Sequence, residues 1–136
     1  MDSSHISCRP LLSDKAYGFL RSDSRFDRFT ALCNAEPGWD GRDAKSIQIA
    51  SVVSFNLFCE HVSHMRLEAE PSLFLGHDGC LEVSQVDEDL TVHIRFIDAR
   101  IVEVWKSDES EDGQPVPLTR QALEAALGSR GLVEFH

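Results

Sequence analysis

The spacing of apolar residues divides the chain into a helical first half and a strand-rich second half. Residues 23–34 and 47–66 place apolar side chains three or four positions apart, which predicts two amphipathic helices. The second is the longest element expected, and its broad apolar stripe around Phe55 predicts a well-buried helix. Ser46 directly precedes it and is the expected N-cap.

From Pro71 onward the apolar period shortens to two, which is typical of strands. Turn residues such as His77-Asp78-Gly79 separate the apolar runs. The predicted strands are 73–75, 81–86, 90–96 and 100–106. Because short turns join them, they are expected to form an antiparallel meander with one buried face.

The two ends of the chain carry weaker patterns. Residues 1–22 fit either a short helix or a flexible or weakly structured arm, and residues 107–117 read as a solvated acidic loop. Thr119 is a plausible N-cap for a C-terminal helix that Gly128 ends. The predicted fold class is therefore α+β, with two N-terminal helices and one C-terminal helix packed on a four-stranded antiparallel meander sheet.

Length and composition support one domain spanning residues 1–136. A chain of this size with 42% apolar residues can bury a sizeable core without disulfides. The start shows no secretory signal, and no apolar run is long enough to cross a bilayer, so a cytoplasmic protein is expected. The four cysteines include no CxxC pair, which indicates reduced thiols rather than a zinc ribbon.

Acidic residues are concentrated in the second half. The net charge is −10, and residues 71–106 hold seven acidic and three basic residues while 107–136 hold six and two. Such a field repels phosphate backbones, so direct nucleic-acid binding is not expected. It favours a basic protein partner. The alternative, that the charge only maintains solubility, stays open.

The turn Gly38-Trp39-Asp40-Gly41 is the most distinctive local motif. Asp40 can accept hydrogen bonds from amides just downstream, and Gly41 supplies a positive φ. Trp39 is then expected to pack between the long helix and the sheet, which makes the turn a rigid corner. The alternative is that Trp39 and Asp40 form a binding site with an exposed aromatic ring and a carboxylate.

This motif also carries a resemblance. The matching residues are Gly38-Trp39-Asp40-Gly41, Ala44, Ile47, Pro71 before Leu73-Phe74-Leu75, and Asp78-Gly79 before Leu81-Glu82-Val83. Over about residues 37–105 the chain resembles a family of small uncharacterised bacterial proteins with a Trp-Asp-Gly-x-x-Ala loop before a long helix and a β-meander, often encoded on mobile or accessory DNA. It departs at Ser46, where the family often has proline, and at Ser84-Gln85, where a tryptophan is expected. The resemblance implies the architecture and brings no established activity.

Signals for catalysis or metal binding are weak. Cys59, His61 and His64 are close in sequence, but a tetrahedral metal site needs a further ligand, so neither a metal nor another cofactor is predicted. Walker, GxGxxG and GxSxG motifs are absent. His93 with Glu82 could serve a small hydrolase or ligand-binding domain on the polar face of the sheet.

The favoured site is the sheet face opposite Val102. Ile101 and Trp105 are expected there beside His93 and Arg95, as an apolar patch ringed by charge. Whether the N-terminal segment or the C-terminal helix covers this face stays open. The functional hypothesis is a non-enzymatic acidic protein-binding module, such as an antitoxin, immunity or mobile-element accessory protein, that engages a basic partner or a second copy.

Overall fold

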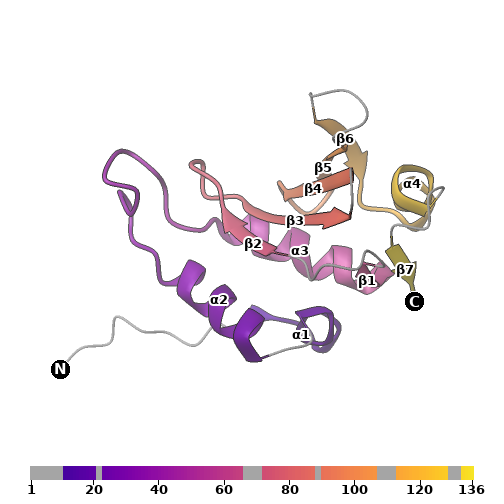
Figure 1. Ribbon diagram of the computed structural model, residues 1–136, viewed down its shortest axis with the longest axis horizontal. Coiled ribbons are helices and arrows are strands. Elements are labelled where there is room, and N and C mark those ends of the chain that lie inside the picture. Colours follow the sequence, from indigo (N-terminus) through magenta and orange to yellow (C-terminus); the bar gives the residue numbers. More distant parts are fainter. Residues whose placement is uncertain (1–10, 21–22, 66–71, 88–89, 107–112, 129–132) are drawn as a thin grey trace.

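The computed structural model describes residues 11–20, 23–65, 72–87, 90–106, 113–128 and 133–136. It has an α+β fold, which confirms the predicted class (Figure 1). A five-stranded antiparallel sheet has the strand order β2-β3-β4-β5-β6, and a separate two-stranded sheet pairs β1 with β7. No helix in the described part of the chain is long and apolar enough to cross a membrane.

The elements in chain order are α1 (Asp14–Leu20), α2 (Asp23–Cys33), α3 (Ile49–His61), β1 (Val62–Met65), β2 (Ser72–Leu75), β3 (Leu81–Asp87), β4 (Leu90–Phe96), β5 (Ile101–Lys106), β6 (Gln114–Pro117), α4 (Arg120–Leu123), the π-helical turn η2 (Glu124–Gly128) and β7 (Val133–Phe135). Strands β2 to β5 lie where the alternating pattern predicts them. The predicted helix 23–34 is confirmed as α2.

The buried face of the sheet packs on α3. Val83, Ile94 and Val104 lie in one row across β3, β4 and β5, and all three are buried. Phe55 of α3 is fully buried, and its ring centroid lies 5.1 Å from that of Phe96. Below α3, α1 contributes further core residues, so the layers run from the sheet through α3 to α1 (Figure 1).

A single hydroxyl joins α3 to two strands. Ser51 Oγ accepts a hydrogen bond from the N–H of Leu81 and donates one to the carbonyl of Phe96, each at 2.7 Å. The paired register of β3 and β4 begins one step further on, at Glu82 and Arg95. The hydroxyl therefore takes the place of the last ladder bond, and it fixes α3 against the sheet at that point.

The long helix is shorter than the predicted span 47–66. It begins after Gln48, which makes no side-chain cap, so the predicted Ser46 cap is wrong. The cause is the hairpin between β2 and β3, because Gln48 N–H donates to the carbonyl of Gly79 and holds the segment extended. At the other end Val62 is extended and starts β1. Pairing with β7 overrides the helical spacing there.

Within the N-terminal segment, the described residues 11–20 include a helix. Residues 1–10 and 21–22 lie outside the described residues, but Asp14–Leu20 form α1. Its buried residues Ala16, Phe19 and Leu20 belong to the core. The Phe19 ring meets both Phe55 and Phe58 edge-on. Burial of these apolar side chains stabilises the helix, which was one of the two alternatives predicted for this segment.

The prediction of a loop over residues 107–117 is wrong for the last four residues. Residues 107–112 lie outside the described residues, while Gln114–Pro117 form β6, a fifth strand paired with β5. Val116 is buried opposite Val102, and this contact supplies the physical reason for the strand. Two prolines in four residues concealed it, because proline is confined to sheet edges.

The C-terminal helix begins as predicted. Thr119 Oγ1 accepts a hydrogen bond from the N–H of Ala122, which confirms the N-cap. After one turn the helix widens into η2, where the carbonyl of Ala126 accepts from the buried Lys106 ammonium. Lys106 lies on the same side of β5 as Val102 and Val104, so this helix packs toward the core side of the sheet.

Replacing Ser51 by alanine should lower the free energy of unfolding by roughly 2–4 kcal/mol, because Leu81 N–H and Phe96 C=O would lose their partner in the core. Ser54 offers a matched control on the same helix. It is equally buried, and its hydroxyl bonds to no residue in the described chain. Ser54→Ala should be neutral or stabilising. Urea titration of both variants checks this, and equal losses would contradict the bridging role.

Candidate functional site

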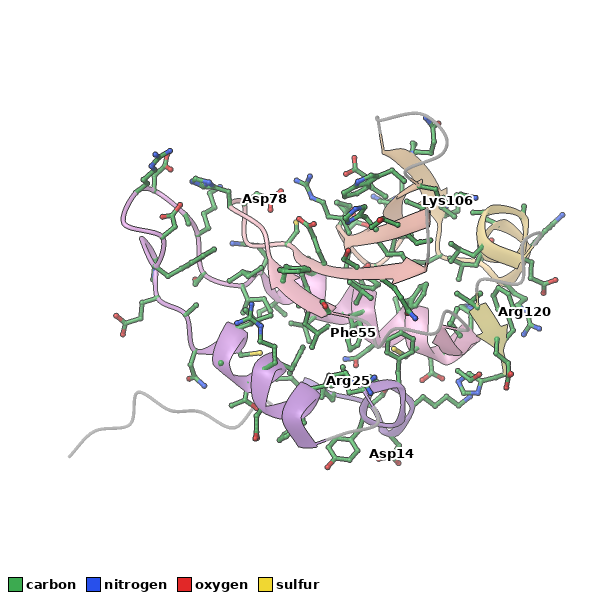
Figure 2. The ribbon with its side chains drawn as sticks, viewed as in Figure 1. Asp14, Arg25, Phe55, Asp78, Lys106 and Arg120 are labelled. Carbon is green, nitrogen blue, oxygen red and sulfur yellow. The ribbon has the colours of Figure 1, made fainter. Side chains whose placement is uncertain are left out.

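Strand alternation leaves one face of the five-stranded sheet turned away from α3. Along β5, Ile101, Glu103 and Trp105 are half-buried while the residues between them are buried, as predicted. Asp78, at the tip of the β2–β3 hairpin (Figure 2), is ion-paired with Arg95, whose side chain lies on this face. The described helices lie on the Phe55 side, so no described helix covers this open face.

Two rows of side chains cross the open face. The first row holds Glu82 on β3, Arg95 on β4 and Glu103 on β5. The second holds Ser84, His93 and Trp105 on the same three strands. An ionic row therefore runs beside an aromatic one. The predicted residues His93, Arg95 and Trp105 do come together, and Ile101 lies two positions from Glu103 on the same strand.

Arg95 is the centre of the ionic row. Its guanidinium is hydrogen-bonded and ion-paired with Asp78, and Nη1 lies 3.6 Å from Glu103 Oε1. Asp78 also accepts a hydrogen bond from the N–H of Cys80 at 3.0 Å. Asp78 therefore ties the hairpin tip to β4.

The carboxyl groups in this cluster have opposite pKa shifts. Burial raises the pKa of Asp78, but hydrogen bonds from Cys80 and Arg95 and the Arg95 charge outweigh it, so the net shift is downward. Burial raises the pKa of Glu82, and the charges of Asp78 and Glu103 raise it further against the opposing effect of Arg95. Ionised Glu82 is thus disfavoured chiefly by burial and further by its acidic neighbours. Burial also raises the pKa of the Cys80 thiol, which favours its neutral form.

The aromatic row is a stacked pair. The His93 and Trp105 rings lie 5.1 Å apart between centroids with 14° between their planes. Burial lowers the pKa of His93, so the imidazole is neutral at neutral pH. The pair presents a flat, uncharged surface next to the carboxylates.

The Trp39–Asp40 turn lies elsewhere and has a structural role. Asp40 Oδ1 accepts hydrogen bonds from the N–H groups of Arg42 and Ala44, and Gly41 has φ +80°, as predicted. Asp40 Oδ2 also lies 3.3 Å from His77 Nε2. The predicted corner is therefore present, and it is joined to the β2–β3 hairpin.

Trp39 does not pack between the long helix and the sheet, so that prediction is wrong. Its indole N–H donates to the carbonyl of Lys45, and 44% of the residue is exposed. The loop is drawn outward by its bonds to the hairpin, with Lys45 N–H donating to the carbonyl of His77. Trp39 instead lines a pocket beside α2 and β2.

No family model, curated protein or solved structure matches this chain. The resemblance carried by the Trp-Asp-Gly loop therefore stays a prediction.

Two of the helix residues considered for metal binding, Cys59 and His61, have described side chains. Cys59 is buried, and burial raises the pKa of its thiol well above the usual value, while His61 is half-buried at the end of α3. The side chain of His64 lies outside the described residues. Within the described ranges, no three His, Cys, Asp or Glu side chains are placed to hold a metal ion.

The sequence pattern identifies Asp78 chiefly as a turn residue and does not predict its ion pair with Arg95. Predicting that pair requires the register between β3 and β4. Once Glu82 pairs with Arg95, the hairpin tip four residues earlier lies at the same end of the sheet. The pocket residues Arg28 and Phe74 gave no sequence signal, because their proximity depends on how α2 meets β2.

We expect Glu82→Gln to raise the melting temperature at pH 7. A raised pKa means that the folded state favours the protonated carboxyl, so ionised Glu82 costs stability above its folded pKa. That cost disappears below the unfolded pKa of about 4.3, where both states are protonated. Thermal unfolding between pH 3 and pH 8 should show the gain shrinking as the pH falls. Glu36→Gln, an exposed control of equal charge change, should show a smaller gain, and a loss at pH 7 for Glu82→Gln would contradict the assignment.

Gly79→Ala should destabilise the protein more than Gly41→Ala. Both glycines have positive φ, so alanine costs about 1–2 kcal/mol of backbone strain at either position. At Gly79 a Cβ would also lie 2.4 Å from the Ser46 carbonyl oxygen, whereas at Gly41 it would meet nothing within 4 Å. Denaturant unfolding of both variants measures the difference. Equal losses would show that the loop and hairpin are not tightly joined in solution.

Proposed function

We propose that this chain is a non-enzymatic acidic protein-binding module of the cytoplasm that engages a basic protein partner, as an antitoxin, immunity or mobile-element accessory protein does. The observation that carries the proposal is the open sheet face, where the carboxylates of Glu82 and Glu103 flank the flat His93–Trp105 pair. Tryptophan surrounded by charge is typical of protein-binding surfaces. Since Arg95 is already paired with Asp78, the row retains negative charge for a cationic partner.

The outer edge of β6 is poorly suited to pairing with a strand from a partner, which favours binding through the open face. Leu118 N–H donates to the carbonyl of Arg100, so Val116 and Leu118 direct their main-chain groups toward β5. Pro115 and Pro117 direct theirs outward and have no N–H to donate. This edge therefore resists pairing with another strand.

The edge of β2 is also engaged. Gly76 N–H donates to the carbonyl of Cys80, so Leu73 and His77 direct their main-chain groups away from β3. Arg28 Nε donates to the carbonyl of Leu73, and Lys45 N–H donates to that of His77. A partner strand of ordinary length would have to displace both contacts, which again favours the open face.

The alternative, a small hydrolase or ligand-binding domain using His93 and Glu82, has less support. His93 stacks on Trp105, while the charged groups that shift the Glu82 pKa are Arg95, Asp78 and Glu103. A neutral histidine can act as a base, but a base must lie within reach of the proton it takes. The pocket beside α2 contains neither residue.

The test compares Trp105 with an apolar residue away from the face. The tagged protein captures its partner from a cell lysate at moderate salt, and the partner is then purified and titrated calorimetrically. Trp105→Ala should weaken binding by roughly 30-fold, as expected for removal of a central anchor, while Leu57→Ala, at an exposed position of α3, should leave it unchanged.

The ionic contribution is measured with Glu82→Gln combined with Glu103→Gln. This double variant should lower the association rate and flatten its salt dependence, because it removes the field that steers a cationic partner. The control, Glu36→Gln combined with Glu60→Gln, makes an equal charge change off the face. Affinity unchanged by Trp105→Ala, or lost equally in both double variants, would contradict binding through the face.

A further inference from the structure

A pocket of about 300 Å³ lies where α2 meets the edge strand β2. This volume is at the lower end of the range for ligand-binding clefts. Its lining is mainly apolar and includes one cation. The lining residues are Arg28, Ala31, Leu32, Ala35, Trp39, Phe74 and Leu75. Two aromatic residues keep large exposed fractions there, 44% for Trp39 and 45% for Phe74. The volume is large enough for one apolar side chain together with its main-chain amide and carboxylate.

Leu75, one of the lining residues, offers main-chain groups at the edge of β2. Main-chain groups alternate in direction along an antiparallel strand. Leu75 lies two positions from both Leu73 and His77, so its N–H and C=O, like theirs, point away from β3. The neighbours on that edge are bonded, Leu73 to Arg28 and His77 to Lys45. Leu75 lies between these two contacts and lines the pocket. An occupant with one amide group can therefore pair with this strand over a single residue.

Arg28 places a guanidinium at the same pocket. Its Nε is directed at the Leu73 carbonyl, which orients the planar group along the strand edge. The two terminal nitrogens of a guanidinium match the two oxygens of a carboxylate. A cation at the wall of an apolar pocket selects an apolar group that carries a negative charge.

We propose that this pocket binds the carboxy-terminal apolar residue of a polypeptide. The side chain occupies the space beside Ala31 and Ala35, the last amide pairs with the main chain of Leu75, and the terminal carboxylate meets Arg28. The pocket borders the open face at Phe74, which lies opposite Glu82 at the β2 end of the ionic row. Its other lining residues come from α2, the Trp39 turn and Leu75, so the inference goes beyond the proposed function and does not depend on it.

The experiment titrates the full chain with small probes and follows calorimetry and Trp39 fluorescence. N-acetyl-leucine should bind about tenfold more tightly than N-acetyl-leucinamide, because only the acid offers a carboxylate to the Arg28 guanidinium. The peptide acetyl-Ala-Ala-Leu with a free carboxyl terminus should bind more tightly than octanoate, which lacks the amide.

Variants locate the site. Arg28→Gln should abolish the preference for the acid, and Ala31→Trp should block binding by filling the pocket. Ala35→Leu is a second filling variant in case Ala31→Trp fails to fold by circular dichroism. Lys15→Gln, which makes the same charge change on α1, should bind the probes like the unmodified protein. Trp105→Ala should also bind them normally, which separates this site from the open face.

Equal binding of the acid and the amide, or binding that survives both filling variants, would overturn the site. Octanoate that binds as tightly as the peptide would overturn the polypeptide occupant and assign the pocket to a free carboxylic acid. Loss of probe binding in Trp105→Ala would overturn its separation from the open face.

Discussion

The hydroxyl of Ser51 fixes the geometry on which the other features depend. It joins α3 to the ends of β3 and β4, where the direct ladder between these strands begins one residue later. The strands leaving that point carry Glu82 and Arg95 outward, and the core below them is closed by Phe55 and Phe96. One buried side chain therefore fixes the position of α3 against the sheet and lies next to the first residues of the ionic row, Glu82 and Arg95.

That ionic row is unequally neutralised. At Asp78, burial is outweighed by hydrogen bonds from Cys80 and Arg95 and by the Arg95 charge, and the pKa of Asp78 falls. Burial raises the pKa of Glu82, and two neighbouring carboxylates raise it further. A protein selected only for stability gains little from such an arrangement, because an ionised group held at raised pKa lowers the free energy of unfolding. The cost is understandable where a cationic group from outside completes the row. The neutral His93 beside it adds no positive charge that would repel such a group.

The sequence predicted the elements whose pattern is local. The alternation in β3 to β5, the Asp40 turn and the Thr119 cap depend on neighbouring residues, and all are present. The predictions from sequence failed where pairing with a segment distant in the chain determines the local conformation. Residues 62–65 leave the helix to pair with β7, which is about 70 residues away, and Gln114–Pro117 become a strand because β5 offers an edge.

The candidate site divides in the same way. Alternation alone placed His93, Arg95 and Trp105 on one face, but it could not supply the register that sets Arg95 between Glu82 and Glu103. Trp39 was misplaced because the bonds from the 45–48 segment to the hairpin draw the loop outward, and those bonds have no signature in either segment. The pocket beside α2 is likewise a product of packing between elements separated by some 40 residues.

Apart from its main-chain pairing with β5, strand β6 contributes one buried side chain, Val116, while Gln114, Pro115 and Pro117 are exposed. Such a strand detaches at a small fraction of the cost of global unfolding. Its detachment uncovers the edge of β5, where the N–H groups of an alternating Val-Glu-Val-Trp segment replace two prolines. Pairing through the edge of β5 would therefore require β6 to open first, whatever the global stability of the protein.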